Sequence, residues 1–244
     1  MVLAPHHLEA LGRLSTSAVV DAIETFDIRL RNEGFVDGSI HCWLPQLPPM
    51  VGYAATVRVR TAIPPMVGGA YVDRTDWWQR VLAVPAPRVV VIEDTDTPVG
   101  TGALIGGVYA NIVRALGAVG IVTNGAIRDV DELAELGLQA FARRVVPSHA
   151  YAHVFEYDVP VRIGGLEIAP GSLLHGDRNG VVSIPDAIAA EIPRAAAARA
   201  NRDARIIALC RSAQFSPDAL RALLPDGSPA MPANRHANNE DTHE

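Results

Sequence analysis

Two adjacent residues, Arg128 and Asp129, carry opposite charges shortly after the turn Thr123-Asn124-Gly125. An arginine can clamp a carboxylate or a phosphate, and an aspartate is a hard oxygen ligand for a divalent cation. Asp129 also suits the first turn of a helix, where a carboxylate meets the positive end of the helix dipole. The alternative is that Asp129 only caps the helix while Arg128 makes a surface ion pair. We take the pair as the candidate catalytic centre.

Two apolar segments are expected to position this pair. Val119–Val122 precedes the turn, and Pro87–Asp94 is a longer apolar run that ends in acidic residues. Uninterrupted apolar runs are typical of strands buried on both faces. A helix expected over Ala103–Leu116 joins them, so the two strands should be parallel with a right-handed crossover. Ligands of such sheets bind at the carboxyl ends of the strands.

Glycines mark the entry into the helix expected at Ala103. Gly102 and the pair Gly106-Gly107 follow the strand that ends at Asp94. Free backbone N–H groups at a helix start can bind a carboxylate or a phosphate, although this spacing matches neither a P-loop nor the dinucleotide fingerprint. The alternative is close packing of the helix on the strand. Because loops after neighbouring parallel strands lie side by side, these glycines should adjoin Arg128 and Asp129.

Histidines and further carboxylates give weaker candidates. His149 and His153 have the spacing of a zinc helix, but no third ligand is evident and Pro147 argues against a helix there, which favours a loop or a subunit interface. Asp94 and Asp96 could add carboxylates to the same pocket. Asp177 is expected to form a turn. No Gly-x-Ser-x-Gly elbow supports a serine hydrolase.

Beyond these segments, the pattern predicts one α/β domain over residues 1–224, without a linker or repeat, and a disordered tail over 225–244. Gly52–Thr61 alternates and is expected to be a strand with one face in water. The other expected elements are helices over 14–26, 75–84 and 187–212, and strands over 138–146, 161–168 and 181–184.

Composition restricts the classes of protein. The net charge of −6 and pI of about 5.7 argue against a nucleic-acid partner. Two distant cysteines cannot form a disulfide framework, so a cytoplasmic location is expected. The N-terminus lacks the apolar stretch of a signal peptide, and no run is long enough to span a membrane.

With these residues described, the chain resembles the RraA-like family, which includes 4-hydroxy-4-methyl-2-oxoglutarate aldolases and regulators of RNase E activity. The most specific part is Asn124-Gly125-Ala126-Ile127-Arg128-Asp129, which is similar to the family pattern Asp-Gly-x-x-Arg-Asp. Pro170-Gly171 through Asp177, Gly180 and Pro185 are similar to a second family pattern. The resemblance extends from Leu14 to the last long helix.

The resemblance implies an α/β/α sandwich like the phosphohistidine swivelling domain, assembled as a homotrimer or hexamer with sites between subunits. It also implies that Mg²⁺ or Mn²⁺ binds Asp129 and that Arg128 contacts a 2-oxo acid and stabilises its enolate. Asp203 is the best match for a carboxylate that a neighbouring subunit contributes near the cation. The substrate carboxylate would be held by the backbone amides of the loop Gly106, Gly107, Val108 and Tyr109.

The implied activity is that of a class II-type lyase, which releases pyruvate by retro-aldol cleavage or by decarboxylation of oxaloacetate. Three departures from the family pattern bear on it: Gly107 replaces an acidic residue, and Asn124 and Ser172 each replace an aspartate. Loss of a carboxylate near a cation weakens its binding. The rival hypotheses are a regulator without catalytic activity, which binds a protein partner, and a lyase of the same scaffold with another substrate.

Overall fold

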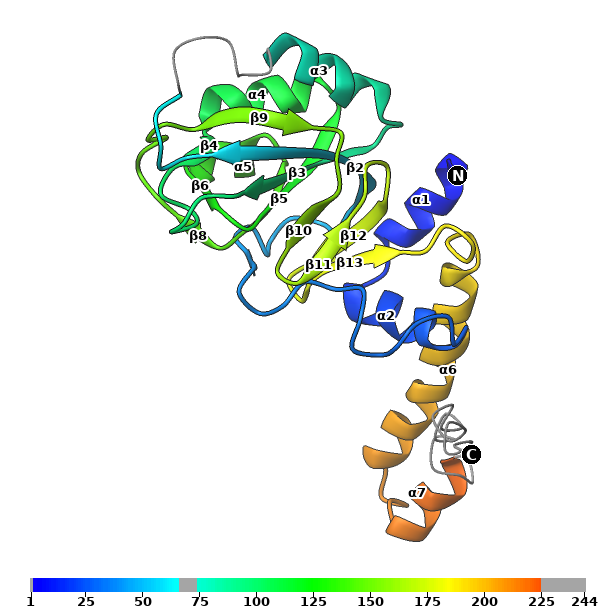
Figure 1. Ribbon diagram of the computed structural model, residues 1–244. Coiled ribbons are helices and arrows are strands. Elements are labelled where there is room, and N and C mark those ends of the chain that lie inside the picture. The colour runs from blue at the N-terminus through cyan, green and yellow to red at the C-terminus, as the bar shows by residue number, and fades with distance from the viewer. Residues whose placement is uncertain (1, 66–73, 225–244) are drawn as a thin grey trace, which may run out of the picture. The chain divides into compact units, whose positions relative to one another are not determined.

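The computed structural model describes residues 2–65 and 74–224, and the chain divides into two compact units, Met1–Arg199 and Ala200–Glu244. The expected disordered tail over 225–244, like part of the expected loop at 64–69, lies outside the described residues. The first unit has a mixed α/β fold, which confirms the α/β part of the predicted fold class (Figure 1). Within the described ranges, no helix is long and apolar enough to cross a membrane.

One large sheet forms the centre of the first unit. Its strands β2, β3, β5 and β7 are parallel to one another, and β1, β12, β13 and β9 are antiparallel to their neighbours. The strands, in spatial order, are β1 (His41–Cys42), β7 (Gln139–Ala142), β5 (Ala118–Thr123), β3 (Arg88–Asp94), β2 (Met50–Arg60), β12 (Leu173–Asp177) and β13 (Gly180–Ile184), and β9 (His153–Tyr157) pairs with the second half of β2. The parallel pairing of β3 with β5 confirms the predicted strand–helix–strand unit.

The segment from Phe35 to Cys42 closes the sheet almost into a barrel. Phe35 forms a bridge with Val182 of β13, and the Val36 N–H donates to the Val181 carbonyl oxygen at 3.0 Å. A few residues later the same segment enters β1, which pairs with β7 at the opposite end of the strand order. The two edges of the sheet are therefore joined by one short stretch of chain.

Among the described residues of the first unit, the helices pack against the outer face of this sheet. Outward side chains of β2, such as Val57 and Tyr53, pack against two helical groups in separate hydrophobic clusters. The inner face instead packs against the hairpin β10–β11 (Val161–Ile163, Leu166–Ile168). The helices of the first group are α3 (Arg74–Ala83), α4 (Gly107–Ala115) and α5 (Val130–Glu135), and those of the second are α1 (Pro5–Gly12), α2 (Thr16–Glu24) and α6 (Ile192–Cys210). The expected α/β/α layering is therefore wrong, because the sheet curls around its own inner face.

Strand β2 is buried on both faces, which corrects the prediction of one wet face. Its polar position Thr56 is 1% exposed. Arg58 keeps partial exposure by pairing with Glu93 and Glu156, each at 2.8 Å. Alternating polar and apolar residues indicate a half-solvated strand only when the sheet is open. Here the face of β2 that carries the polar residues points towards the enclosed inner side of the curved sheet.

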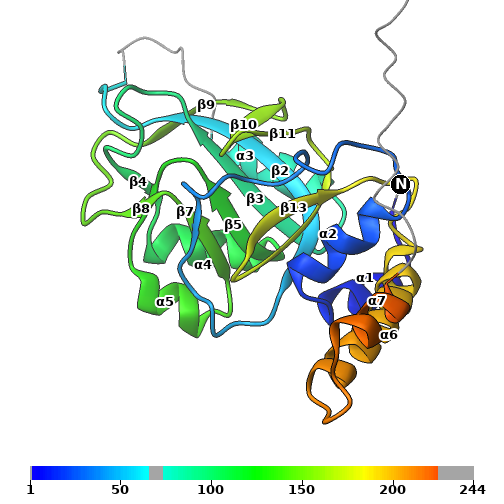
Figure 2. The same ribbon diagram turned by 90° about the horizontal axis from the view of Figure 1, so that it is seen from below.

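A second, smaller parallel sheet extends the large one. Strand β3 leads through the loop 95–102 into β4 (Ala103–Ile105), and β5 and β7 lead through short turns into β6 (Ala126–Ile127) and β8 (Arg144–Val145). The three short strands pair in the order β4, β6, β8. The expected helix over 103–116 therefore begins later, at Gly107, and its first residues form β4. Helix α5 begins directly after β6, and Figure 2 shows α4 and α5 side by side.

Other predicted elements are confirmed with changed ends. The helix expected over 14–26 is α2, the helix over 75–84 is α3, and α6 begins at Ile192 rather than near 187. The strand expected over 138–146 is divided into β7 and β8, and that over 161–168 is a hairpin with a turn at Gly164-Gly165. The pattern missed α1, β1, β9, β12 and the short helix α7 (Pro217–Leu223).

A buried histidine ties the first two helices to the sheet. His175 of β12 is fully buried, with Nδ1 at 3.0 Å from the Thr16 hydroxyl and Nε2 at 3.2 Å from the Leu11 carbonyl oxygen. Because a carbonyl only accepts, Nε2 carries the proton and Nδ1 accepts from Thr16. Asp177, two residues on, accepts from the Thr16 backbone N–H at 3.1 Å. Burial lowers the pKa of His175 below its ordinary value, so the neutral ring is the folded form.

We expect acid to destabilise the protein through His175. A group whose folded-state pKa is lowered adds stability above its unfolded pKa, about 6.5 for histidine, and that stability is lost as the pH falls below it. The change His175→Gln keeps a donor for Leu11 and removes the titration. Between pH 7.5 and pH 5 the free energy of unfolding, measured with urea, should fall by about 1 kcal/mol more in the wild type than in this variant. His6→Gln, on an exposed face of α1, serves as the control and should retain the wild-type pH dependence.

Candidate active site

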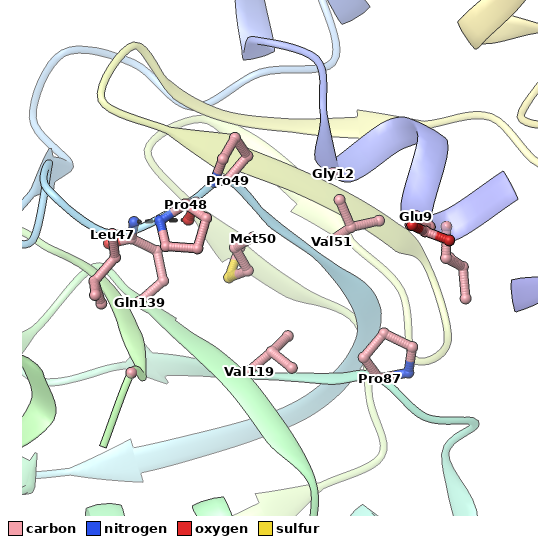
Figure 3. A pocket seen from close by; sticks show the side chains of 12 residues that line it. Glu9, Gly12, Leu47, Pro48, Pro49, Met50, Val51, Pro87, Val119 and Gln139 are labelled. Atoms are coloured by element: carbon pink, nitrogen blue, oxygen red, sulfur yellow. Dashed lines mark hydrogen bonds between the residues drawn. The ribbon is translucent and has the colours of Figure 1, made fainter. Parts of the chain in front are cut away.

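Two cavities lie at opposite ends of the parallel strands. The first has a volume of about 360 Å³ and lies at their amino ends, where Pro48, Met50, Pro87 and Val119 line it (Figure 3). Its lining is mainly apolar, and its carboxylate, Glu9, already pairs with Arg13. The amino-end cavity therefore offers little chemistry.

The second cavity lies at the carboxyl ends and is lined by four of the predicted site residues, Gly106, Val108, Tyr109 and Arg128. Its volume is about 320 Å³, within the range of small-molecule sites. We call it the carboxyl-end cavity, and its lining residues are Trp78, Leu104, Gly106, Val108, Tyr109, Ile112, Arg128, His149 and Ala152. It combines an apolar wall with polar groups from β4–α4 and β6–α5.

A single hydrogen bond joins the two predicted halves of the site. The Gly107 N–H, at the start of α4, donates to Asp129 Oδ2 at 2.7 Å. Asp129 has φ 54° and ψ 49°, and its side chain makes no capping bond to its own helix, α5. A left-handed conformation at a non-glycine residue is uncommon. The carboxylate therefore turns towards α4, which contradicts the alternative that Asp129 caps α5.

Arg128 lies against the same carboxylate with part of its donor capacity unused. Its Nε is 3.7 Å from Asp129 Oδ2, beyond hydrogen-bonding distance, and this buried nitrogen has no acceptor among the described residues. Nη1 reaches the Pro147 carbonyl oxygen only at 3.5 Å. A Cβ at position 106 would collide with the Arg128 side chain, so Gly106 permits this close approach. Arg128 can therefore receive an anionic ligand.

Glu132 of α5 is a site residue that the sequence analysis missed. A Cβ at position 107 would collide with its carboxylate, which therefore lies where a side chain at 107 would project. Asn111 of α4 holds it there by donating to Glu132 Oε1 at 2.7 Å. An acidic residue one helical turn after Asp129 is the signal that could have identified it.

The start of α4 supplies backbone donors, as predicted for Gly106 to Tyr109. Gly106 is the residue before the helix, and the N–H groups of a first helical turn lack acceptors within their own helix. The Gly107 N–H donates to Asp129. Val108 lies at the rim of the cavity and is 81% exposed. The Tyr109 hydroxyl accepts from Trp77 Nε1 at 2.9 Å, so that side chain is held in the core.

Asp94 and Asp96 are structural rather than part of the cavity. Asp94 Oδ2 accepts from the Thr61 hydroxyl at 2.8 Å and from the Gly100 N–H at 2.7 Å. Asp96 Oδ2 accepts from the Thr61 and Ala62 N–H groups at 2.6 and 2.7 Å. Asn124 caps this arrangement, because its Oδ1 accepts from the Asp94 N–H at 2.7 Å. The expectation that these aspartates add carboxylates to the pocket is therefore wrong.

The remaining candidates are dispersed. His149 borders the carboxyl-end cavity, whereas His153 is buried at the start of β9, so their spacing does not create a zinc site. Asp177 forms the β12–β13 turn as predicted, accepting from the Asn179 N–H at 2.8 Å. Asp203 lies on α6 in the second compact unit.

The oxygen ligands fit a magnesium-type cation better than a closed metal site. Among residues 2–65 and 74–224 no three histidine, cysteine or acidic side chains form a metal-binding cluster. Mg²⁺, however, uses one or two carboxylates and keeps several waters. Asp129 is 45% exposed, and Glu132 faces the same glycine. These two carboxylates are the residues that would hold a divalent cation.

Fold and site together define a mixed α/β protein with a polar site at the carboxyl ends of parallel strands, a usual location for ligands. The family model described as RraA-like, Aldolase/RraA, matches residues 16–183. The chain therefore belongs to the RraA-like family.

Individual relatives support the same assignment. A Thermus thermophilus protein named 4-hydroxy-4-methyl-2-oxoglutarate aldolase is 36% identical over 85 residues, which cover 34% of this chain and 52% of that protein. A Pseudomonas syringae pv. tomato protein named putative 4-hydroxy-4-methyl-2-oxoglutarate aldolase is 40% identical over 85 residues, with the same coverage of 34% and 52%. The chain thus spans about half the length of the curated relatives it matches.

Solved structures match over more of the chain. A crystal structure of an uncharacterized protein from Pseudomonas syringae pv. tomato superposes with a TM-score of 0.70 at 25% identity, covering 92% of this chain and 96% of that one. Streptomyces coelicolor RraAS2, described as an unusual member of the RNase ES inhibitor RraA protein family, shares the fold with a TM-score of 0.65 at 24% identity, covering 83% and 96%.

Two matched substitutions test which aspartates are structural. Asp94→Asn replaces an acceptor of two buried hydrogen bonds, so the free energy of unfolding should fall by about 1.5–3 kcal/mol. Asp129→Asn keeps an acceptor for Gly107 and suits the left-handed backbone, so its effect should stay below about 1 kcal/mol. Urea unfolding of both variants measures this, and equal losses would contradict the assignment.

Proposed function

We propose that the protein is a divalent-cation-dependent carbon–carbon lyase that acts on a small 2-oxo acid and releases pyruvate. The observation that carries the proposal is the convergence of Arg128, Asp129 and Glu132 on the start of α4, beside a cavity. Relatives named aldolase support a lyase of this family. The proposed substrates are 4-hydroxy-4-methyl-2-oxoglutarate and oxaloacetate.

Substrate binding would use the start of α4 and Arg128. The substrate carboxylate accepts from backbone N–H groups of the first turn, where the helix dipole favours an anion. Arg128 donates to the 2-oxo oxygen through its guanidinium group, since its side chain lines the cavity and is 33% exposed. As negative charge develops on that oxygen, the guanidinium stabilises it, and this stabilisation lowers the barrier.

Asp129 and Glu132 would hold the cation next to the same oxygen. A divalent cation there supplies Lewis-acid stabilisation of the enolate. Gly107 fixes Asp129 through the 2.7 Å bond, and Asn111 fixes Glu132. We infer that Glu132 replaces the acidic side chain that Gly107 lacks. The proposed assembly is a homotrimer or hexamer in which Asp203 adds a carboxylate from a neighbouring subunit.

Loss of either central side chain should abolish turnover without unfolding the protein. Pyruvate release from both substrates, measured with Mg²⁺, Mn²⁺ or EDTA, should fall at least about 100-fold in Asp129→Asn and Arg128→Ala. Asp131→Asn, on the exposed side of α5, is the matched control and should keep wild-type activity. Wild-type rates in either site variant would refute the assignment. If the wild type releases no pyruvate and binds no Mn²⁺, a regulator without catalytic activity becomes the better description.

Glu132 should contribute to cation affinity independently of any substrate. Glu132→Gln keeps the volume and the contact with Asn111 but removes the charge, so the Kd for Mn²⁺ should rise about 10-fold or more. Titration followed by electron paramagnetic resonance measures free Mn²⁺ directly. Glu135→Gln, exposed on the same helix, should leave the Kd unchanged. An unchanged Kd in Glu132→Gln would show that this carboxylate has no part in cation binding.

A further inference from the structure

The loop between β8 and β9 forms one wall of the carboxyl-end cavity and brings His149 to it. Backbone hydrogen bonds fix this loop. The Ala103 N–H of β4 donates to the Ser148 carbonyl oxygen at 3.0 Å, and the Ala152 N–H donates to that of His149 at 2.9 Å. The position of His149 relative to the start of α4 is therefore set by the smaller sheet.

The ring of His149 has a defined tautomer. Its Nδ1 lies 2.7 Å from the Ala150 carbonyl oxygen. Because a carbonyl oxygen cannot donate, Nδ1 carries the proton in this contact. The neutral ring then has its lone pair on Nε2, which is the form required of a general base.

Among the described residues, no other side chain that lines this cavity is suited to act as a general base. Trp78, Leu104, Val108, Ile112 and Ala152 are apolar. Of the other lining residues, Arg128 carries a guanidinium group, which has donors and no acceptor. The Tyr109 hydroxyl is held in the core by Trp77. Histidine is the residue type that exchanges protons near neutral pH.

We propose that His149 is the general base of retro-aldol cleavage, an inference that rests on the proposed lyase function. With a 4-hydroxy-2-oxo acid, His149 Nε2 takes the proton of the C4 hydroxyl. The C3–C4 bond breaks, the oxygen on C4 becomes a carbonyl, and the electron pair left on C3 takes up a proton from solvent. From 4-hydroxy-4-methyl-2-oxoglutarate the products are two molecules of pyruvate, without net oxidation or reduction.

If His149 is the base of retro-aldol cleavage, a substitution there should affect this reaction and leave decarboxylation at the same site unaffected. Oxaloacetate has no C4 hydroxyl, and it loses CO₂ to give the same enolate, which needs Arg128 and the cation but no base. We therefore expect His149→Gln to lower kcat for retro-aldol cleavage about 100-fold or more while decarboxylation stays at the wild-type rate. Added imidazole should restore retro-aldol cleavage in His149→Ala, because residue 149 is exposed to solvent.

Tyr151→Phe, in the same loop but outside the cavity lining, is the matched control and should leave both activities unchanged. Equal losses of both activities in His149→Gln would overturn the proposal in favour of a structural role for the loop. Unchanged retro-aldol cleavage would overturn it as well. A wild-type protein without either activity would instead contradict the proposed lyase function, and the role of His149 with it.

Discussion

The bond from the Gly107 N–H to Asp129 Oδ2 is the contact on which the candidate site depends. It joins the start of α4 to the residue before α5, and it uses a donor that the helix itself cannot satisfy. The bond exists because β4 and β6 are paired neighbours in a parallel sheet, so the residues after them emerge together. Glycine at 106 and 107 leaves room for Arg128 and Glu132 on either side. The candidate site is thus formed where the starts of α4 and α5 lie next to each other.

Closure of the large sheet determines what else surrounds this site. Because the inner face packs against the β10–β11 hairpin, the helices gather on the outer face. Helices α4 and α5 lie next to each other on that face. The loop that contains His149 leads into β9, which is paired with β2. Both helix starts of the site therefore lie over the outer face of the curved sheet.

The sequence carried enough information for the central arrangement. Apolar runs ending at Asp94 and Thr123 predict parallel strands, and parallel strands predict that Gly106-Gly107 adjoins Arg128-Asp129. What it could not predict depends on tertiary context. Closure of the sheet buries both faces of β2, so its alternation indicated a solvent face that does not exist. The short strand β4 resembles a helix start because Ala103 and Leu104 suit either structure.

Carboxylates were the hardest residues to assign from sequence. Asp94, Asp96 and Asp129 each lie near the carboxyl end of a strand, yet of these three only Asp129 accepts from the start of α4. The difference arises from hydrogen bonds to Thr61 and Gly100, which come from loops with no recognisable pattern. Glu132 was missed because its importance appears only when the space beside Gly107 is considered.

The most direct test of this account is a crystal structure of the protein with Mn²⁺ and oxalate, an inert mimic of the pyruvate enolate. Anomalous scattering locates Mn²⁺ without reference to any assumed ligand. The account predicts Mn²⁺ beside the Asp129 carboxylate, with oxalate between Arg128 and the first turn of α4. Mn²⁺ bound elsewhere, or oxalate away from Arg128, would contradict the assignment of this site.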